Sequence, residues 1–365
     1  MLGESTERFL LNERPRTLYQ QQIGYSSAHS PSMDLVTGGT GIVGVHVLNE
    51  LLVRGRSVRA LYRPTADREL VRRVLKHYHA DGDTLFQRIQ WVPGDLLDPL
   101  ALAEAMHGVE RVFHCAALVS FDPRDAKAMF LHNIQGTANV VNAMLANGTT
   151  RLCHVSSTAT IGAKPDGSPN NEDVPFVSDK HASPYAVSKH EAELEVQRGI
   201  AEGLHAVMVN PCVIIGPGPA GRSSMTIIER MRKGSRFYPR GSNAVVDARD
   251  VASAMVRLLE EGTCGERYLL VGENLSYQRL FGVITAAFGM ASPRTTLSPW
   301  MLELAWRLEA MRTLFGGRPM ITRISARTAS RTRHYDGSRA AALMGQPFRS
   351  AEVAVKNVAD FLTAQ

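Results

Sequence analysis

The chain has 365 residues, 44% of them hydrophobic, which is enough to bury the core of one large α/β domain with a second lobe. Its formal net charge of +6 is modest, and without zinc-finger spacing or a stripe of stacking aromatics it indicates no nucleic-acid partner. The four cysteines are scattered, with no CxxC pair or His/Cys cluster, so we expect no metal site and a reducing, cytoplasmic location. No stretch reaches about 18 apolar residues, so the sequence predicts no membrane span.

Residues 1–32 are polar and lack the apolar core of a signal peptide, and we interpret them as a flexible extension. The next segment, residues 37–44, reads TGGTGIVG and stands between a strand-like apolar run and a helical pattern. Here Gly38 permits a tight turn, Gly41 lets the backbone approach a pyrophosphate, and Gly44 lets the helix pack close to the strand. The free N–H groups of the helix then favour the phosphates. GxGxxG is satisfied as well, so the glycines alone do not choose between dinucleotide families.

The identity of the dinucleotide depends on the end of the next expected strand, residues 57–62. Arg63 follows it, and no acidic residue appears before Asp67. An NAD site usually places Asp or Glu about 20 residues after the glycines, whereas an arginine pairs with a 2′-phosphate through charge-assisted bonds. The sequence therefore favours NADP(H); NAD(H) and a solvated arginine stay open.

Downstream, apolar runs alternate with helical patterns, which is typical of parallel βαβ units with helices on both faces. The remaining expected elements are strands at 89–92, 111–115, 152–155 and 205–209, and helices at 67–78, 126–146 and 184–201. Past Pro211 the pattern loosens into Gly, Pro, Arg and Ser. We predict a doubly wound parallel α/β sheet in residues 33–210. A smaller substrate-binding lobe is expected mainly in residues 211–365, with some segments returning to the first domain.

A YxxxK pair, Tyr185 and Lys189, stands near the start of an expected helix, behind Ser183 and Pro184 as cap and first-turn proline. The i to i+4 spacing puts both side chains on one helix face. A neighbouring ammonium lowers the pKa of a phenol, which can then exchange a proton with a carbonyl or alcohol oxygen. The lysine can also bond the nicotinamide ribose. By spacing alone the pattern is weak, and an exposed i,i+4 pair would normally be the better explanation.

Two further polar residues complete the expected site. Ser157 follows the strand at 152–155, at the carboxyl edge of the sheet, where ligands bind in open α/β sheets. We expect its hydroxyl to hold the substrate oxygen and orient the phenol, with Ser156 and Thr158 as competing candidates. Asn133, inside the long expected helix, is interpreted as bending that helix and holding a water near the lysine; a solvated helix residue is the alternative.

Taken in order, these motifs resemble those of the extended short-chain dehydrogenase/reductases, the NAD-dependent epimerase/dehydratase superfamily. The matching segments are TGGTGIVG at 37–44, GDLLD at 94–98, HCAA at 114–117, NIQGT at 133–137, HVSS at 154–157 with Gly162, YAVSK at 185–189, NP at 210–211, GPG at 216–218 and VDARDVA at 246–252. Asn210 replaces the usual arginine. Arg63 and the stretch TRHYDGSRAAAL at 332–343 resemble the dihydroflavonol-reductase and 3β-hydroxysteroid-dehydrogenase-like branch.

The resemblance implies a Rossmann-like fold and a role for each matching residue, with Asp95 bonding the adenine amine. The implied catalytic residues are Ser157, Tyr185, Lys189 and Asn133. The implied cofactor-binding residues are Gly38, Thr40, Gly41, Ile42, Val43, Gly44, Arg63, Asp95, Leu96, Ala116, Ala117, Tyr185, Lys189, Pro211 and Ile214. No metal is implied, and a homodimer is a family expectation.

Two C-terminal segments bear on substrate and partners. Residues 299–315 read PWMLELAWRLEAMRTLF, a helix that could cap an apolar substrate, lie weakly on a membrane surface, or pack in the core or a dimer. The arginines between 318 and 333 could meet a phosphate-bearing substrate or form a solvated basic face.

These observations together predict an NADP(H)-dependent oxidoreductase acting on the carbonyl or alcohol of a small, largely apolar molecule, with Tyr185 as proton donor. The alternative is a nucleotide-sugar epimerase or dehydratase with tightly bound NAD. Arg63 argues against it, and so does Thr158-Ala159, where such dehydratases often carry Asp-Glu. A non-catalytic NADP-sensing protein is the third reading.

Overall fold

A computed structural model describes residues 32–179, 182–319 and 321–364 of the chain. The expected extension, residues 1–32, falls almost wholly outside the described residues, so its flexibility stays a prediction. Residues from Ser32 onward form one compact unit. The domain boundary expected near residue 210 also stays a prediction. Strands from both sides of that position share one sheet.

The centre of this unit is a seven-stranded sheet in the order β10-β6-β5-β4-β1-β2-β3. Its strands are β1 (Met33–Thr37), β2 (Ser57–Tyr62), β3 (Ile89–Pro93), β4 (Val109–His114), β5 (Arg151–Val155), β6 (His205–Pro211) and β10 (Arg267–Leu270). Every neighbouring pair is parallel. The strand order reverses between β1 and β4, and ligands of such sheets bind in the crevice beyond the carboxyl ends at that switch point. The predicted doubly wound parallel sheet is confirmed.

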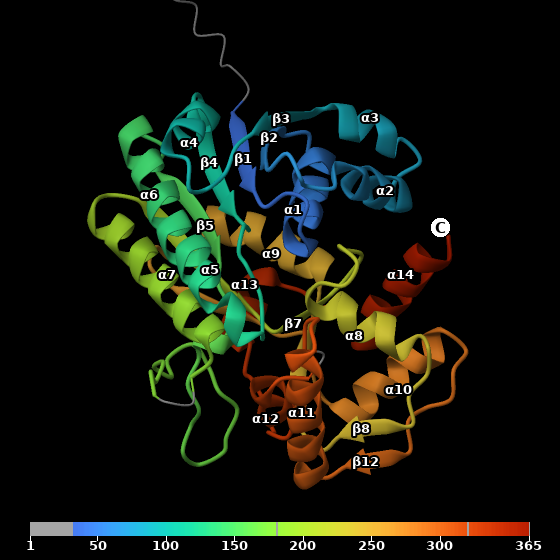
Figure 1. Cartoon of the computed structure of the whole chain (residues 1–365). Coiled ribbons are helices and arrows are strands. Elements are labelled where there is room, and N and C mark those ends of the chain that lie inside the picture. Colours follow the sequence, from blue (N-terminus) through green and yellow to red (C-terminus); the bar gives the residue numbers. More distant parts are fainter. Residues whose placement is uncertain (1–31, 180–181, 320, 365) are drawn as a thin grey trace, which may run out of the picture. The chain divides into compact units, whose positions relative to one another are not determined.

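Helices cover both faces of this sheet, as Figure 1 shows. On one face lie α1 (Ile42–Val53), α2 (Arg68–Tyr78), α3 (Gly82–Gln87) and α9 (Ala248–Glu261), and on the other α4 (Pro99–Met106), α6 (Gly136–Asn147) and α7 (Pro184–Ala201). Neighbouring strand residues divide between the two cores: Val36 and Cys153 point to the first, Leu35 and Leu152 to the second. Alternation of side chains along each buried strand therefore builds two apolar layers from one sheet.

Local signals explain where several helices begin. The Ser183 hydroxyl accepts a hydrogen bond from the Ala186 N–H at 3.1 Å, with proline in the first turn of α7. Asp98 caps α4 in the same way, accepting bonds from the N–H groups of Leu100 and Ala101. The long helix expected over residues 126–146 is present but not continuous. It consists of α5 (Ala126–Met129), a π-helical segment η2 (Phe130–Gln135) and α6.

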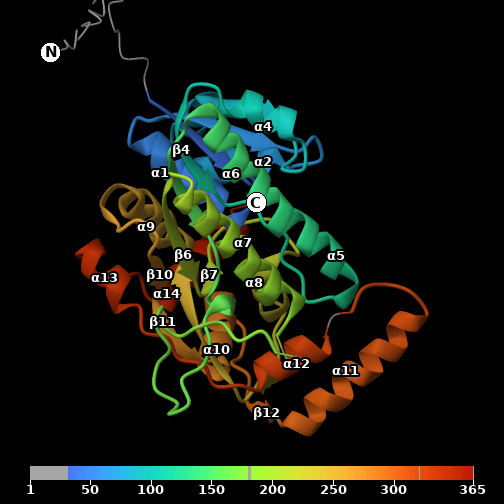
Figure 2. The same cartoon turned by 90° about the vertical axis from the view of Figure 1, so that its left-hand side faces the viewer.

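Residues after β6 build the second lobe beside the sheet (Figure 2). Its strands are β7 (Val213–Ile215), β9 (Ser242–Asp247) and β11 (Glu273–Ser276) in one sheet, and β8 (Phe237–Pro239) and β12 (Thr295–Leu297) in another. Its helices are α8 (Ser223–Met231), α10 (Tyr277–Ala287), α11 (Pro299–Leu314), α12 (Arg323–Ala329) and α14 (Ala351–Thr363). Helix α13 (Ser338–Met344) returns to the central sheet, where it packs on β10 and α9. Short 3₁₀ turns, η1 (Pro123–Asp125) and η3 (Thr158–Thr160), precede α5 and follow β5. Across the described helices, none combines the length and apolarity needed to cross a bilayer.

Candidate active site

The glycine-rich turn between β1 and α1 has the geometry that its sequence predicts. Gly38 adopts φ +67°, and a Cβ at this position would lie 2.6 Å from the backbone of Ala116. The Gly41 N–H donates to the Gly38 carbonyl at 2.9 Å, which closes the turn. A Cβ on Gly44 would strike the same carbonyl. Since no side chain caps the first turn of α1, its N–H groups face the turn as an anion-binding end.

Other predicted cofactor residues gather around this turn. Thr40, Ile42 and Val43 belong to the turn and to the start of α1, and a Cβ on Gly218 would lie 3.1 Å from the Ile42 Cβ. The loop that carries Gly218 follows β7, beyond Pro211 and Ile214, and returns to the glycine-rich turn.

Arg63 and Asp95 lie at the carboxyl ends of the neighbouring strands β2 and β3. Arg63 is exposed, and the Asp95 carboxylate accepts a hydrogen bond from the Leu97 N–H at 3.0 Å. Leu96, the residue after Asp95, is buried against α6, where a Cβ on Gly136 would lie 3.1 Å from the Leu96 Cβ. Ala117, after β4, is exposed. The predicted cofactor residues therefore line one edge of the sheet.

Lys189 is buried beneath this edge, with only 2% of the residue exposed. Its Nζ donates to the carbonyl of Val155 at 2.7 Å and lies 3.3 Å from Nε2 of His154. Burial lowers the pKa of Lys189 from 10.5 to about 8, although the charge of Glu193 opposes this shift. With the ammonium as donor, His154 Nε2 must accept, so its proton sits on Nδ1, which has no partner in the described chain.

Tyr185 stands one turn before Lys189 on α7 and forms a side-chain hydrogen bond with Ser157. Burial raises the pKa of Tyr185, and the bond with Ser157 partly opposes that increase. The expected lowering of the phenol's pKa by Lys189 was wrong in direction, because burial dominates and the ammonium is directed at β5. Of the three serine and threonine candidates, Ser156 instead donates to Glu193, and Thr158 is buried in η3.

Asn133 lies in the π-helical segment and connects two parts of the site. Its Oδ1 accepts from the Leu118 N–H at 2.7 Å, and its Nδ2 donates to the Leu118 carbonyl at 3.0 Å and to Ser188 Oγ at 2.9 Å. Ser188 in turn donates to the Tyr185 carbonyl. Both amide hydrogens are thus used to hold the loop after β4 against α7, which is a positioning contact rather than one directed at Lys189.

A buried chain of hydrogen bonds fixes His114 beside this arrangement. Thr137 donates to the Asn133 carbonyl at 2.6 Å, so it accepts from His114 Nε2 at 3.0 Å. The other ring nitrogen, Nδ1, then accepts from the Thr37 hydroxyl at 2.7 Å. Burial and the nearby Lys189 lower the pKa of His114 to about 3, so the ring stays neutral.

A family model described as the NAD dependent epimerase/dehydratase family matches residues 35–270 of the chain. The chain belongs to this epimerase/dehydratase family. A Synechocystis sp. protein provisionally named a dihydroflavonol 4-reductase is 31% identical over 330 residues, covering 88% of this chain and 91% of its own length. Cinnamoyl-CoA reductase 1 of Oryza sativa subsp. japonica is 30% identical, covering 69% and 75% of the two chains.

Solved structures agree with this family assignment. The crystal structure of gox2253 has a TM-score of 0.75 and 31% sequence identity, covering 91% of this chain and 98% of its own. The dTDP-glucose 4,6-dehydratase DesIV of Streptomyces venezuelae, solved with NAD bound, has a TM-score of 0.71 at 22% identity, covering 91% and 97% of the two chains. The predicted family and fold are confirmed, and the reductase names of the relatives agree with the predicted NAD(P)-dependent oxidoreductase class.

The sequence analysis missed one buried acid of this epimerase/dehydratase-family site. Glu193 follows Lys189 by four residues on α7, so spacing alone could have placed it on the catalytic face. Its Oε1 accepts from Asn210 Nδ2 at 2.7 Å, from the Thr160 hydroxyl at 2.8 Å and from Ser156. Asn210, where the family usually has arginine, thus meets the carboxylate as a neutral donor.

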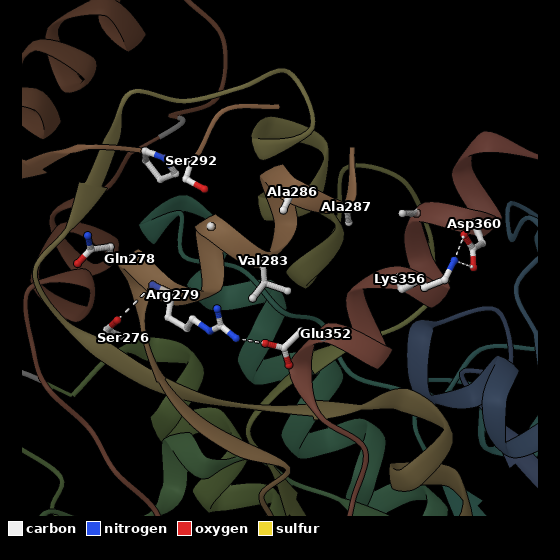
Figure 3. Close-up of a pocket in the computed structure, with 13 residues that line it drawn as sticks. Ser276, Gln278, Arg279, Val283, Ala286, Ala287, Ser292, Glu352, Lys356 and Asp360 are labelled. Carbon is white, nitrogen blue, oxygen red and sulfur yellow. Dashed lines mark hydrogen bonds and ion pairs between the residues drawn. The ribbon is translucent and has the colours of Figure 1, made fainter. Parts of the chain in front are cut away.

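A groove of about 770 Å³ opens elsewhere, between α10 and α14 of the second lobe (Figure 3). Its charged side chains are paired with one another: Arg279 with Glu352, and Lys356 with Asp360. None of the predicted catalytic residues lines it. The predicted catalytic residues lie instead at the sheet edge, around Tyr185 and Lys189.

Proposed function

We propose that the chain is an NADP(H)-dependent oxidoreductase that reduces a ketone or aldehyde of a small, largely apolar molecule, or oxidises the matching alcohol. The observation that carries the proposal is the bond between Tyr185 and Ser157 beside the buried Lys189. The loop after β4 connects this group to the dinucleotide turn, because Ala116 packs on Gly38 and the Asn133 amide holds the same loop.

The glycine turn fits a dinucleotide. The close packing of the turn depends on the absence of side chains at Gly38 and Gly44, because a Cβ at either position would strike neighbouring backbone. The first turn of α1 presents N–H groups without a side-chain cap. When bound, a nicotinamide dinucleotide supplies the hydride that is exchanged with the carbonyl carbon. Arg63 supports the choice of NADP(H), because an exposed guanidinium at the end of β2 suits a 2′-phosphate. Arg68, whose guanidinium lies 4.6 Å from the Tyr62 ring centroid, adds a second cation nearby.

The side chains of the site transfer the proton. In the reduction, the Tyr185 hydroxyl gives its proton to the oxygen that becomes the alcohol, while Ser157 donates a hydrogen bond to that oxygen. The raised pKa of Tyr185 keeps the phenol protonated at neutral pH, which suits a proton donor. Solvent then restores the proton to the phenolate that remains. Asn133 and Ser188 hold α7 in place for this transfer.

The substrate class follows from the relatives. The names of these relatives refer to a dihydroflavonol and to a cinnamoyl thioester. The name of a Methylococcus capsulatus protein, 31% identical over 274 residues, refers to a sterol. These skeletons are largely apolar. We therefore propose a carbonyl or alcohol on an apolar skeleton, and not a nucleotide sugar, as the substrate.

The test is the variant Tyr185→Phe, assayed by NADPH absorbance against a panel of aldehydes, ketones, and sterol and flavonoid alcohols. Loss of the proton donor should lower turnover about 10²- to 10⁴-fold and leave NADPH binding, measured by fluorescence titration, unchanged. Tyr238→Phe, which removes a phenol hydroxyl from β8, is the matched control and should retain activity. Full turnover in Tyr185→Phe would refute the assignment. Purified protein that holds NAD firmly and consumes no added NADPH would favour the epimerase or dehydratase alternative.

A further inference from the structure

The loop after β4 exposes a short apolar row. Over residues 117–122, exposed side chains alternate with more buried ones. The exposed ones are all apolar: Ala117, Val119 (39% exposed) and Phe121 (46% exposed). The positions between them include the polar Ser120 and the buried Asp122. This is the reverse of the usual preference, in which polar side chains face solvent, so the row is a candidate binding surface. We call these three apolar residues the β4-loop row.

Hydrogen bonds fix the loop that carries this row. The Ser120 hydroxyl donates to Asp125 Oδ2 at 2.7 Å and accepts from the Asp122 N–H at 3.1 Å. At the other end of the loop, the Asn133 amide holds both the N–H and the carbonyl of Leu118. The exposed apolar side chains therefore stand on a segment that is anchored at both ends.

The row leads from the glycine-rich turn to the proposed proton donor. At its start, the backbone of Ala116 packs on Gly38. At its end, the Phe121 ring meets the Tyr185 ring in an edge arrangement, with the ring centroids 6.4 Å apart and the planes at 63°. Tyr185 also bonds with Ser157. A substrate whose oxygen meets these two hydroxyls therefore has its neighbouring atoms within reach of Phe121.

The charged groups beside the row are paired. Arg124 forms an ion pair of 2.7 Å with Asp122, and Arg318 of the second lobe forms one of 2.9 Å with Asp125. Arg124 also donates to the Gly317 carbonyl at 3.2 Å, which attaches the second lobe to this loop. Each of the two arginines is matched by a carboxylate, so these pairs add no net positive charge that would favour a substrate phosphate. An apolar group is the occupant that the row favours.

We propose that Phe121 is a specificity-determining residue that selects substrates with a flat aromatic ring next to the reacting carbonyl. Aromatic side chains prefer a second ring in edge-to-face or offset contact, which adds to the burial of apolar area that a saturated skeleton of the same size also gives. The Phe121 ring has one such neighbour in Tyr185, and nearly half of the residue remains exposed for another. The inference rests on the proposed function, since it takes the Tyr185 hydroxyl as the group that meets the carbonyl oxygen.

The first test compares kcat/KM with NADPH for benzaldehyde and for cyclohexanecarbaldehyde, which have the same carbon skeleton but differ in flatness. Phe121→Leu keeps an apolar side chain and removes the ring. It should lower kcat/KM for benzaldehyde roughly three- to tenfold and change that for cyclohexanecarbaldehyde less than about twofold. Phe121→Tyr retains a ring and should retain the preference. Phe237→Leu is the matched control, because Phe237 is exposed to a similar extent (45%) on β8, and it should change neither value.

A second readout needs no turnover. Binding of benzyl alcohol and of cyclohexylmethanol is measured by ligand-observed NMR titration with NADPH present, because the reduced cofactor cannot oxidise an alcohol. Phe121→Leu should weaken only the binding of benzyl alcohol. That result in a chain that reduces no carbonyl compound would contradict the proposed function and leave Phe121 as a ring-binding residue. Equal effects of Phe121→Leu on the aromatic and saturated compounds, or no effect on either, would overturn the proposal even where reduction depends on Tyr185. Absence of both binding and turnover of these compounds in the original chain would overturn it too.

Discussion

The pH dependence of turnover should report the ionisation of Lys189, and His154→Leu should shift it. In the structure Lys189 has a pKa of about 8 instead of 10.5, which corresponds to about 3 kcal/mol of disfavoured charge. His154 Nε2, 3.3 Å from the ammonium, and the Val155 carbonyl are its two acceptors among the described residues. A hydrogen bond to a charged group contributes about 1.5 kcal/mol or more, so its loss should lower the pKa by about one unit, to about 7.

The expected magnitudes follow from this shift. If the ammonium is the active form, kcat/KM falls as pH rises through the pKa of Lys189, by about tenfold per unit on the alkaline side. At pH 7.5 the protonated fraction drops from about three quarters in the original chain to about one quarter in His154→Leu, a loss of roughly threefold. Near pH 6 both proteins are almost fully protonated and should differ little. Above pH 9 the ratio approaches roughly ten.

Other groups that face Lys189 do not titrate in this window. The pKa of His114 is lowered to about 3, burial raises the pKa of the Cys115 thiol, and burial also raises the pKa of Tyr185. The descending limb near pH 8 is therefore assigned to the ammonium.

The assay is kcat/KM for carbonyl reduction with NADPH, measured from acid to alkaline pH. Cys153→Ala is the matched control, because this neighbouring residue of β5 faces the other side of the sheet and should leave the limb near pH 8. A limb that stays in place in His154→Leu would refute the role of the histidine. Activity that does not decline above pH 8 in the original chain would refute the need for a charged Lys189.

Two further predictions concern the cofactor and stability. Arg63→Ser should raise KM for NADPH roughly 10- to 100-fold, as expected for loss of a charge-assisted bond, and should leave KM for NADH unchanged. Substitution of another exposed arginine, Arg88→Ser, is the control. Equal effects of Arg63→Ser on both cofactors would contradict the 2′-phosphate assignment. His46 is buried between Ile42 and Tyr78, and burial lowers its pKa to about 4. The neutral ring therefore stabilises the fold above pH 6.5, and this contribution, up to about 3 kcal/mol, is lost as pH falls toward 4. Urea unfolding at pH 7 and pH 5 measures this loss, and an unchanged free energy of unfolding would contradict it.

The fold could be predicted where local signals and periodicity agree. Strand β2 and helix α7 have the bounds that the sequence predicts, because Ser183 and Pro184 mark the start of α7 unambiguously. Helices α3 and α4 were missed, since six and eight residues are too short for a clear apolar period. The interruption of the long helix by η2 was not predicted as a π-helix. Asn133 signalled a bend, but the partners that stabilise it come from the loop after β4.

The site could be predicted only as far as its linear motifs reach. Tyr185, Lys189 and Ser157 are found by spacing, but the direction in which Lys189 points is not. It depends on the parallel register that sets His154 opposite His114 in neighbouring strands, and on burial beneath the sheet edge. Register between strands far apart in sequence leaves no periodic signal in a single chain. The raised pKa of the phenol follows from the same burial.

The charge of Glu193 opposes the effect of burial on the pKa of Lys189. The carboxylate is buried and meets the neutral amide of Asn210, so its charge is not cancelled there and raises the pKa of Lys189 against the effect of burial. Arg267 lies 3.7 Å from its other oxygen and offsets part of this charge. Glu193→Gln retains an oxygen that can accept from Asn210 and Thr160 but removes the charge. The alkaline limb of kcat/KM should therefore move to lower pH, in the same direction as in His154→Leu, while the circular dichroism spectrum and NADPH binding stay unchanged. A limb that stays in place would show that the carboxylate does not stabilise the ammonium, and that burial alone sets the pKa on which the site depends.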